Sequence, residues 1–327
     1  MGPSSRPLRP ATRWDFEIAI ICALPTEANE VRKLFEPRWD KTEPPYNKAP
    51  GDPNTYSTGA IGRHNVVLVH MPHMGKVKAA GAAASCRSSF PNIKLAVLVG
   101  ICAAVPFPTP TSEIILGDVI ISKGAVQYDF GRQTATGFDT KVDILDNLAR
   151  PNTEIAGVLA KLALDDARNE FEDEIDKFMG AVKYPGQKAD IVFEATIDHK
   201  DGDSCGDCGV PLRRTRLDGK AGSPRLKVHL GIVATGDTVM KSGSVRDKIA
   251  KERGVIAFEM EAAGVWDTFP CVVIKGACDY ADSHKHKAWQ QYAAARAAAC
   301  MKVFLDYFEP SRKRKQSFGG GWRYSFG

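Results

Sequence analysis

The chain has 327 residues, of which 43% are hydrophobic, 25% charged and 9% aromatic. This length and composition allow a large buried core, and they exclude a wholly disordered or collagen-like chain. The formal net charge is +5. Eight basic residues and no acid lie in residues 1–14 and 311–327, so the body between them carries more acids than bases. The overall charge therefore gives no argument for nucleic-acid binding.

The eight cysteines do not indicate a disulfide framework. Six of them lie in apolar or helical stretches, where cysteine behaves as a small buried hydrophobe. The N-terminus has no apolar signal segment, and no apolar run approaches the ~20 residues of a membrane helix. We expect a soluble, cytoplasmic protein with no membrane partner. The basic run 312–315 leaves a nuclear signal open as an alternative.

Short apolar runs alternate with helical patterns along the chain. The first half predicts, in chain order, strand 16–22, helix 27–35 beginning near Pro25, loop 37–56, strand 65–69, helix 77–89, strand 95–100 and strand 117–122. The second half predicts a mostly helical region 142–180, strand 228–234, helix 242–252, strand 257–259, helix 260–268, strand 272–276 and helix 289–307. This order is typical of a single α/β domain with a mainly parallel mixed sheet flanked by helices.

Composition divides the chain into three parts. We expect a disordered N-terminal arm at 1–14, one catalytic domain at 15–308 and a basic disordered tail at 309–327. Within the domain, residues 198–224 are rich in Gly, Asp, Cys and Arg, and they predict an insertion loop. The acidic cluster of Glu170, Glu172, Asp173 and Glu174 is expected to be a solvated face.

The insertion also contains a Cys-x-x-Cys pair, Cys205 and Cys208, with His199 nearby. Structural zinc takes four ligands, and the sequence offers no second pair. We therefore expect free thiols or a loop staple here rather than a metal.

Acidic residues recur where the predicted strands end. They are Glu27, Asp237, Glu259, Glu261, Asp279 and Asp282. In open α/β sheets, ligands bind beyond the carboxyl ends of the strands. Each acid alone could cap a helix, but a buried carboxylate is costly unless it is paired or used. Several acids at one edge therefore indicate a site.

Two motifs, FEMEAAG at 258–264 and CDYAD at 278–282, resemble the purine nucleoside phosphorylase and nucleosidase superfamily, which includes the MTA/SAH nucleosidases. Further similar stretches lie at 18–31, 99–106, 116–122, 231–243 and 279–295. The resemblance is greatest to the fungal branch, whose domain often begins large NLR-type proteins. It implies a nucleoside phosphorylase-like fold and a homo-oligomer.

The resemblance also implies three catalytic roles. Asp279 would protonate purine N7, Glu261 would bind the ribose hydroxyls, and Glu27 would activate water. A carboxylic acid that protonates N7 must hold its proton near neutral pH, which requires a pKa raised by burial. The sugar becomes positively charged in the transition state, so a carboxylate beside its hydroxyls suits the chemistry.

The attacking group distinguishes a hydrolase from a phosphorylase. Phosphorylases of this superfamily use a Gly-Asp-Pro-x-Arg loop after the first strand, and an Arg and a Ser near the third. Residues 22–27 contain no Arg here, and Leu98 and Ile101 occupy the other two positions. Phosphate without its arginines loses charge-assisted bonds of roughly 1.5–3 kcal/mol each, which favours water. The alternative that another cation binds phosphate in place of these arginines stays open, and the candidates are Arg32, Lys76 and Lys78.

The remaining expected substrate contacts are Gly75, Lys76, Gly100, Ile101, Val239, Met240, Lys241, Glu259, Met260, His284 and Lys285. Val239 stands where the family often has an aromatic residue against the base. Lys76, Lys241 and the run 284–287 would bind a 5′-phosphate, which would make AMP or ATP the substrate; a solvated loop is the alternative for that run. Met260 either packs under the substrate or belongs to the core.

The sequence therefore predicts a purine nucleosidase that releases adenine from adenosine or an adenine nucleotide. It predicts a small-molecule substrate, no cofactor, no metal and no nucleic-acid partner. A phosphate-dependent phosphorylase remains an alternative, and so does a nucleoside- or nucleotide-sensing module without turnover.

Overall fold

The computed structural model describes residues 7–42, 44–135, 137–140, 150–200, 205, 208–212, 214–217, 224–285 and 287–311. The strands are β1 Ile18–Cys22, β2 Thr55–Ile61, β3 His64–His70, β4 Leu95–Ala104, β5 Val119–Gln127, β6 Gly131–Thr134, β7 Gly137–Thr140, β8 Val228–Thr235, β9 Val255–Glu259 and β10 Cys271–Asp279. The helices are α1 Pro25–Lys33, α2 Lys76–Ser89, α4 Thr153–Lys161, α5 Asp165–Asp176, α6 Gly243–Arg253, α7 Ala262–Val265 and α8 Gln290–Tyr307. Short 3-10 turns lie at Arg13–Asp15, Gln187–Ala189 and Lys287–Trp289.

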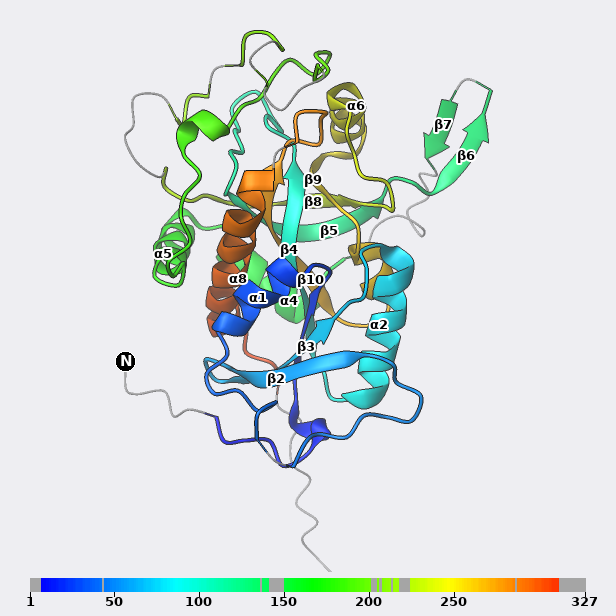
Figure 1. Ribbon diagram of the computed structural model, residues 1–327, viewed down its shortest axis with the longest axis vertical. Helices are drawn as coiled ribbons and strands as arrows, with labels where there is room; N and C mark the ends of the chain where they lie inside the picture. The colour runs from blue at the N-terminus through cyan, green and yellow to red at the C-terminus, as the bar shows by residue number, and fades with distance from the viewer. Residues whose placement is uncertain are drawn as a thin grey trace, which may run out of the picture.

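Eight strands form one mixed sheet in the order β10-β5-β8-β9-β4-β1-β3-β2, with helices on both faces (Figure 1). Five of the eight strand pairings are parallel, so the prediction of a mainly parallel sheet in an α/β domain is confirmed. Strand β10 pairs with β4 as well as with β5. This extra pairing closes β10, β5, β8, β9 and β4 into a ring.

Both faces of the sheet are buried. Along β1, Ala19 and Ile21 pack into the core beneath α2 and α7, while Ile18 and Ile20 pack into the core beneath α1 and α8. Successive side chains of a strand point to opposite faces, so a strand covered on both sides is apolar throughout. This burial explains why the predicted strands showed continuous apolar runs.

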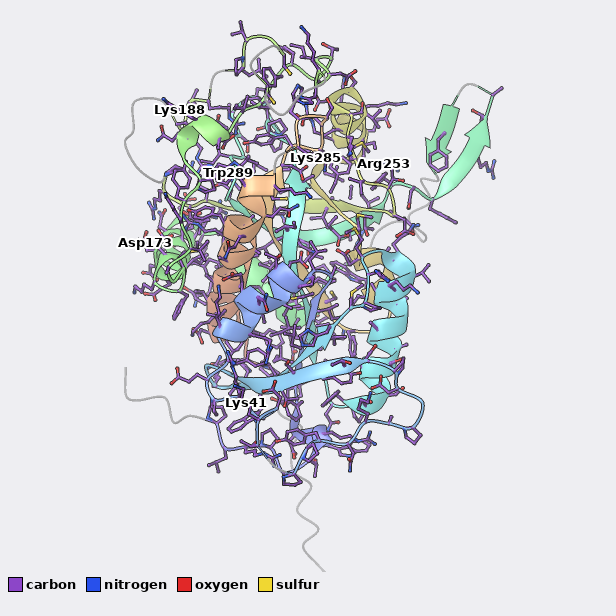
Figure 2. All side chains as sticks on the ribbon, viewed as in Figure 1. Lys41, Asp173, Lys188, Arg253, Lys285 and Trp289 are labelled. Atoms are coloured by element: carbon purple, nitrogen blue, oxygen red, sulfur yellow. The ribbon has the colours of Figure 1, made fainter. Side chains whose placement is uncertain are left out.

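Helix α8 lies directly against β10 and fixes the segment that follows it. Its first turns are alanine-rich, which allows a close approach: a Cβ added at Gly276 would lie 2.1 Å from the carbonyl oxygen of Ala293. Trp289 lies at the N-terminal end of the helix (Figure 2), and its indole N–H donates to the carbonyl of Ala189 at 2.9 Å. The helix end of the turn between β10 and α8 is therefore fixed.

The structure differs from the sequence prediction at three places. Residues 55–61 were not predicted as a strand, yet β2 pairs antiparallel with β3 across a two-residue turn that contains Gly62, at φ +55°. The hairpin β6–β7, which projects from the body (Figure 1), was also missed. Helix 260–268 is wrong in extent, because only Ala262–Val265 is helical. β2 has a polar sequence, TYSTGAI, and its place at the edge of the sheet tolerates it.

The acidic cluster at 170–174 is not wholly solvated. Glu172 is buried, and its carboxylate accepts the backbone N–H of Val228 at 2.8 Å. Burial raises the pKa of Glu172. The prediction of a solvated face is therefore wrong for this residue, which connects α5 to the start of β8.

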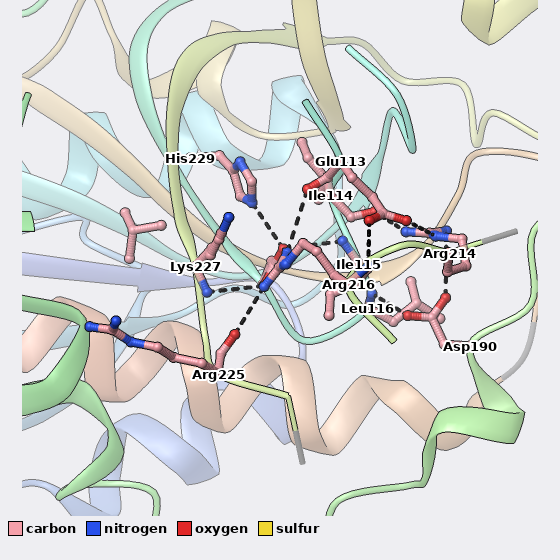
Figure 3. A network of polar contacts seen from close by, with 12 residues as sticks. Glu113, Ile114, Ile115, Leu116, Asp190, Arg214, Arg216, Arg225, Lys227 and His229 are labelled. Carbon is pink, nitrogen blue, oxygen red and sulfur yellow. Dashed lines mark hydrogen bonds and ion pairs between the residues drawn. The ribbon is translucent and has the colours of Figure 1, made fainter. Parts of the chain in front are cut away.

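The described residues of the predicted insertion, 198–224, contain no helix or strand. Two arginines, the buried Arg214 and the partly buried Arg216, anchor its end to the loop before β5 (Figure 3). Arg214 donates to Glu113 at 2.8 Å, and Arg216 forms a bidentate ion pair with Asp118. His229 also contacts Asp118, at 2.9 Å. Burial alone would raise the pKa of Asp118, but His229 and Arg216 hold it below its usual value.

The predicted disorder of the two ends falls mostly outside the described residues, which omit 1–6 and 312–327 and with them the basic run 312–315. Residues 7–14 lie against the body: the guanidinium of Arg9 is 4.6 Å from the ring centre of Tyr46, whose hydroxyl donates to the carbonyl of Pro10. In the part of the chain that the structure describes, the helices are too short or too polar to cross a bilayer.

The Asp118 network predicts a large stability effect. We expect Asp118→Asn to lower the free energy of unfolding by about 3–5 kcal/mol, because it removes the buried carboxylate that pairs with the partly buried Arg216 and with His229. The matched control is Asp173→Asn, which removes an exposed pair with Arg225 and should cost less than about 1 kcal/mol. Urea unfolding measures both variants, and equal losses would contradict the assignment.

Candidate active site

A cavity of about 210 Å³ opens where β1, β4, β9 and β10 end. Its lining combines apolar side chains with carboxyls and lysines, as is typical of small-molecule sites. Nine of the sequence-predicted site residues line it: Glu27, Ile101, Val239, Met240, Glu259, Met260, Glu261, Asp279 and Lys285. The segments that carry them are far apart in the sequence, and the closed ring of strands brings them together.

Glu27 lies at the base of this cavity, held by backbone groups. Helix α1 begins at Pro25, a residue well suited to the first helical position, which makes Glu27 the third. One carboxylate oxygen therefore reaches back to accept the N–H groups of Ala23 and Leu24, each at 2.9 Å. The other oxygen accepts the N–H of Ile101 on β4, at 2.8 Å. These three bonds fix the carboxylate and support its ionised form.

Burial raises the pKa of Glu27 above its usual value. Two nearby charges act in opposite directions: the Lys275 ammonium lowers this pKa, and the Glu261 carboxylate raises it. Glu27 is thus a stronger base than an exposed glutamate, and Lys275 limits how far its pKa rises.

Glu261 shares Lys275 with Glu27. The Lys275 ammonium donates to Glu261 Oε2 at 3.1 Å and lies 3.9 Å from Glu27 Oε1. The other Glu261 oxygen is 3.5 Å from the backbone N–H of Gly75. Lys275 is 2% exposed, so its charge acts on the two carboxylates with little solvent screening.

Glu259, which the sequence predicted as a substrate contact, forms hydrogen bonds with the backbone of the chain. Its carboxylate accepts the backbone N–H groups of Glu261 and Ala262 at 3.0–3.1 Å, at the start of α7. Burial raises the pKa of Glu259, and the Glu261 carboxylate raises it further. Glu259 therefore orients the backbone that carries Glu261, and it also lines the cavity.

Asp279 ends β10 on the opposite side of the cavity. Its Oδ1 accepts the ammonium of Lys285 and the backbone N–H of Ala281, each at 2.9 Å. The Cys278 thiol lies 3.4 Å from Oδ2. Ala281 has φ +57°, a strained conformation for a residue other than glycine, and strain of this kind is concentrated at functional sites.

Five predicted contacts do not line the cavity. Gly100 lies directly behind Glu27, and Gly75 contacts Glu261 through its backbone. The Lys76 ammonium is bound to the Asp129 carboxylate at 2.6 Å. The other two are Lys241, which is exposed, and His284, which lines a neighbouring cavity.

Lys275 was not among the residues predicted from the sequence. A signal was present, because a lone lysine inside an apolar strand, VVIKGAC, is buried only when it is paired. Among the residues that the structure describes, the group able to hold a metal ion is His199, Cys205 and Cys208, and none of the three lines this cavity.

Residues 17–306 match the family model of the phosphorylase superfamily. The chain belongs to this superfamily. The match covers every strand of the central sheet, and it confirms the resemblance seen in the motifs. A nucleotide-binding leucine-rich repeat (NLR)-like protein of Hyaloscypha variabilis is 35% identical over 312 residues, which are 90% of this chain and 30% of that protein. The chain thus spans less than a third of the length of that relative.

Solved structures share the superfamily fold. A 5′-methylthioadenosine/S-adenosylhomocysteine nucleosidase from Helicobacter pylori is 16% identical, with a TM-score of 0.58 over 89% of this chain and 98% of that one. The corresponding nucleosidase from Streptococcus pneumoniae is 20% identical, with a TM-score of 0.55 over 90% and 100%. Futalosine hydrolase from H. pylori is 15% identical, with a TM-score of 0.54 over 89% and 98%.

The close packing behind Glu27 predicts opposite effects for two glycine substitutions. A Cβ at Gly100 would lie 1.9 Å from Glu27 Oε1, so Gly100→Ala must push the carboxylate off its backbone donors. We expect a loss of about 1–3 kcal/mol in the free energy of unfolding. Gly81→Ala, in open space on α2, should gain about 0.5–1 kcal/mol. Chemical unfolding tests both, and a neutral Gly100→Ala would contradict this geometry.

Proposed function

We propose that this domain is a purine nucleosidase, which hydrolyses the N-glycosidic bond of an adenine nucleoside. The observation that carries the proposal is the pairing of Lys275 with Glu261 beside the fixed carboxylate of Glu27. It supplies a base for water and a carboxylate for the sugar within one cavity. The likeness to nucleosidases in fold and motifs supports the same reaction type.

Glu27 is the proposed general base. Its raised pKa strengthens it as a base, and its three backbone donors leave one lone pair of Oε1 for a water molecule. Water activated there would attack the anomeric carbon of the ribose.

Glu261 is the proposed ligand of the ribose hydroxyls. Lys275 occupies one of its oxygens, which leaves the other to accept hydrogen bonds from the sugar. The negative charge stabilises the sugar as it becomes positively charged in the transition state. Apolar side chains of Val239, Met240 and Phe258 line the remainder of the cavity and suit the purine ring.

Asp279 is the proposed route for the proton that purine N7 takes up. Its carboxylate carries a hydrogen bond from the Lys285 ammonium, so a proton source lies 2.9 Å from Oδ1. In this assignment the substrate receives the proton through the Asp279–Lys285 pair.

The charges that line the cavity favour water over phosphate as the attacking group. Four carboxyl side chains and two lysines line the cavity, and both lysines are already paired with those carboxylates. The substitute cations considered from the sequence do not line it: Arg32 pairs with Asp40, Lys76 with Asp129, and Lys78 is exposed. A phosphate dianion would therefore meet net negative charge. This net negative charge also favours an uncharged nucleoside over AMP or ATP as the substrate.

The relative from H. variabilis is described as NLR-like, so a sensing module without turnover is the alternative from a different class. Product formation separates the two, because a sensor binds its ligand and releases it unchanged.

The deciding experiment incubates the protein with adenosine, inosine, AMP and ATP, each with and without inorganic phosphate. We expect adenine and free ribose from adenosine, at a rate independent of phosphate. Strict phosphate dependence with ribose 1-phosphate as product would establish a phosphorylase. Binding of these ligands without any product would instead support the sensing module.

Substitution of Glu27 and of Glu261 by glutamine should affect turnover and substrate binding differently. Glu27→Gln keeps the shape but cannot accept a proton, so kcat should fall roughly 10²–10⁴-fold while substrate affinity is retained. Glu261→Gln weakens a contact that strengthens in the transition state, so it should lower both kcat and affinity.

Calorimetric binding beside single-turnover rates measures these losses. Glu30→Gln is the matched control, because Glu30 is on the same helix but pairs with Lys33 outside the cavity. If Glu27→Gln abolished binding while Glu261→Gln changed neither quantity, the assigned roles would be reversed or wrong.

A further inference from the structure

The insertion brings three metal-binding side chains together beside the turn that follows β10. His199 Nδ1 lies 3.6 Å from the Cys205 sulfur and 3.5 Å from the Cys208 sulfur. All three ligand atoms lie within 4.8 Å of one another. Both cysteines are free thiols, and Cys208 is buried.

These distances match the edges of a zinc tetrahedron. Zn–S bonds of about 2.3 Å and Zn–N bonds of about 2.0–2.1 Å place tetrahedral sulfur and nitrogen ligands about 3.5 Å apart. Hydrogen bonding alone explains less, because Nδ1 has a single lone pair and cannot accept two thiol protons in good geometry. One cation between the three atoms accounts for both contacts.

His284 is the candidate for a fourth donor, from the turn that follows β10. Its side chain is 2% exposed, and neither ring nitrogen has a hydrogen-bond partner. Its ring centre lies 5.5 Å from that of His199, and it lines a cavity of about 250 Å³ together with Cys205. Nδ1 lies 3.8 Å from Asp282 Oδ1, beyond hydrogen-bond distance. A buried imidazole that makes no hydrogen bond is costly unless it binds a further group.

We propose that Cys205, Cys208 and His199 bind one Zn²⁺ ion, with His284 as the fourth ligand. Thiolate and imidazole ligands in a tetrahedral set suit zinc, and four protein ligands with no open position are typical of a structural site. Sequence reasoning gave at most three ligands because His284 becomes a neighbour only in the folded chain.

The zinc would clamp the insertion to the turn that carries Lys285. The backbone N–H of His199 already donates to the hydroxyl of Ser283, at 2.8 Å. Fixing Ser283 and His284 also fixes Lys285, whose ammonium binds Asp279. The proposal concerns metal binding and does not depend on the proposed function.

Metal analysis of the purified full chain, prepared under reducing conditions with zinc in the growth medium, tests the proposal. We expect about one zinc per chain. The double variant Cys205→Ser/Cys208→Ser should lose it, and His284→Ala should lose zinc to a competing chelator more readily. Cys300→Ala, a buried cysteine of α8, is the matched control and should retain the metal.

Zinc-edge X-ray absorption of the wild-type protein keeps the test decisive even if a variant fails to fold. It should show two sulfur neighbours at about 2.3 Å and nitrogen neighbours at about 2.0–2.1 Å. A chain that binds no zinc, zinc retained by the double variant, or a Cys205–Cys208 disulfide in the freshly purified protein would overturn the proposal. Unchanged zinc retention in His284→Ala would overturn the fourth ligand.

Discussion

The ammonium of Lys275, buried between the carboxylates of Glu261 and Glu27, is the interaction on which the candidate site depends. Burial alone would lower the pKa of Lys275, but the surrounding carboxyls of Glu261, Glu27 and Glu259 raise it above its usual value. The lysine therefore stays charged. Without that charge, closely spaced carboxyls in a buried cavity would repel one another, and their ionised forms would be disfavoured.

The fold places this charge where the acids converge. Strand β10 pairs with β4 along its length and with β5 near its middle, so Lys275 is held in the closed ring of strands by pairing on both sides. The start of α1 brings Glu27, and the start of α7 brings Glu261. Gly276 allows α8 to pack against β10 immediately beyond the lysine. The apolar strands and the small residues of α8 thus serve to hold four carboxyls and two lysines around one cavity.

Sequence reasoning predicted those features that depend on local pattern. Apolar runs located seven of the eight strands of the central sheet, and their carboxyl ends located Glu27, Glu261 and Asp279. The edge strand β2 was missed because its sequence is polar. The pairing of Lys76 with Asp129 could not be predicted, since the two residues meet only when α2 reaches the end of β5. The unpartnered state of His284 likewise depends on packing between distant segments.

We propose that Lys275 keeps Glu27 ionised, and that Glu27 can therefore activate water. This role of Lys275 links the charge cluster to catalysis. It is tested most directly by the pH dependence of kcat/KM for adenosine in wild type, Lys275→Met and the exposed control Lys241→Met. Glu27 must be ionised, so the rate falls as the pH drops through its pKa, which burial raises and Lys275 lowers. We expect Lys275→Met to move this acidic limb to higher pH and Lys241→Met to leave it in place. An acidic limb unchanged in a folded Lys275→Met variant would contradict this role of Lys275.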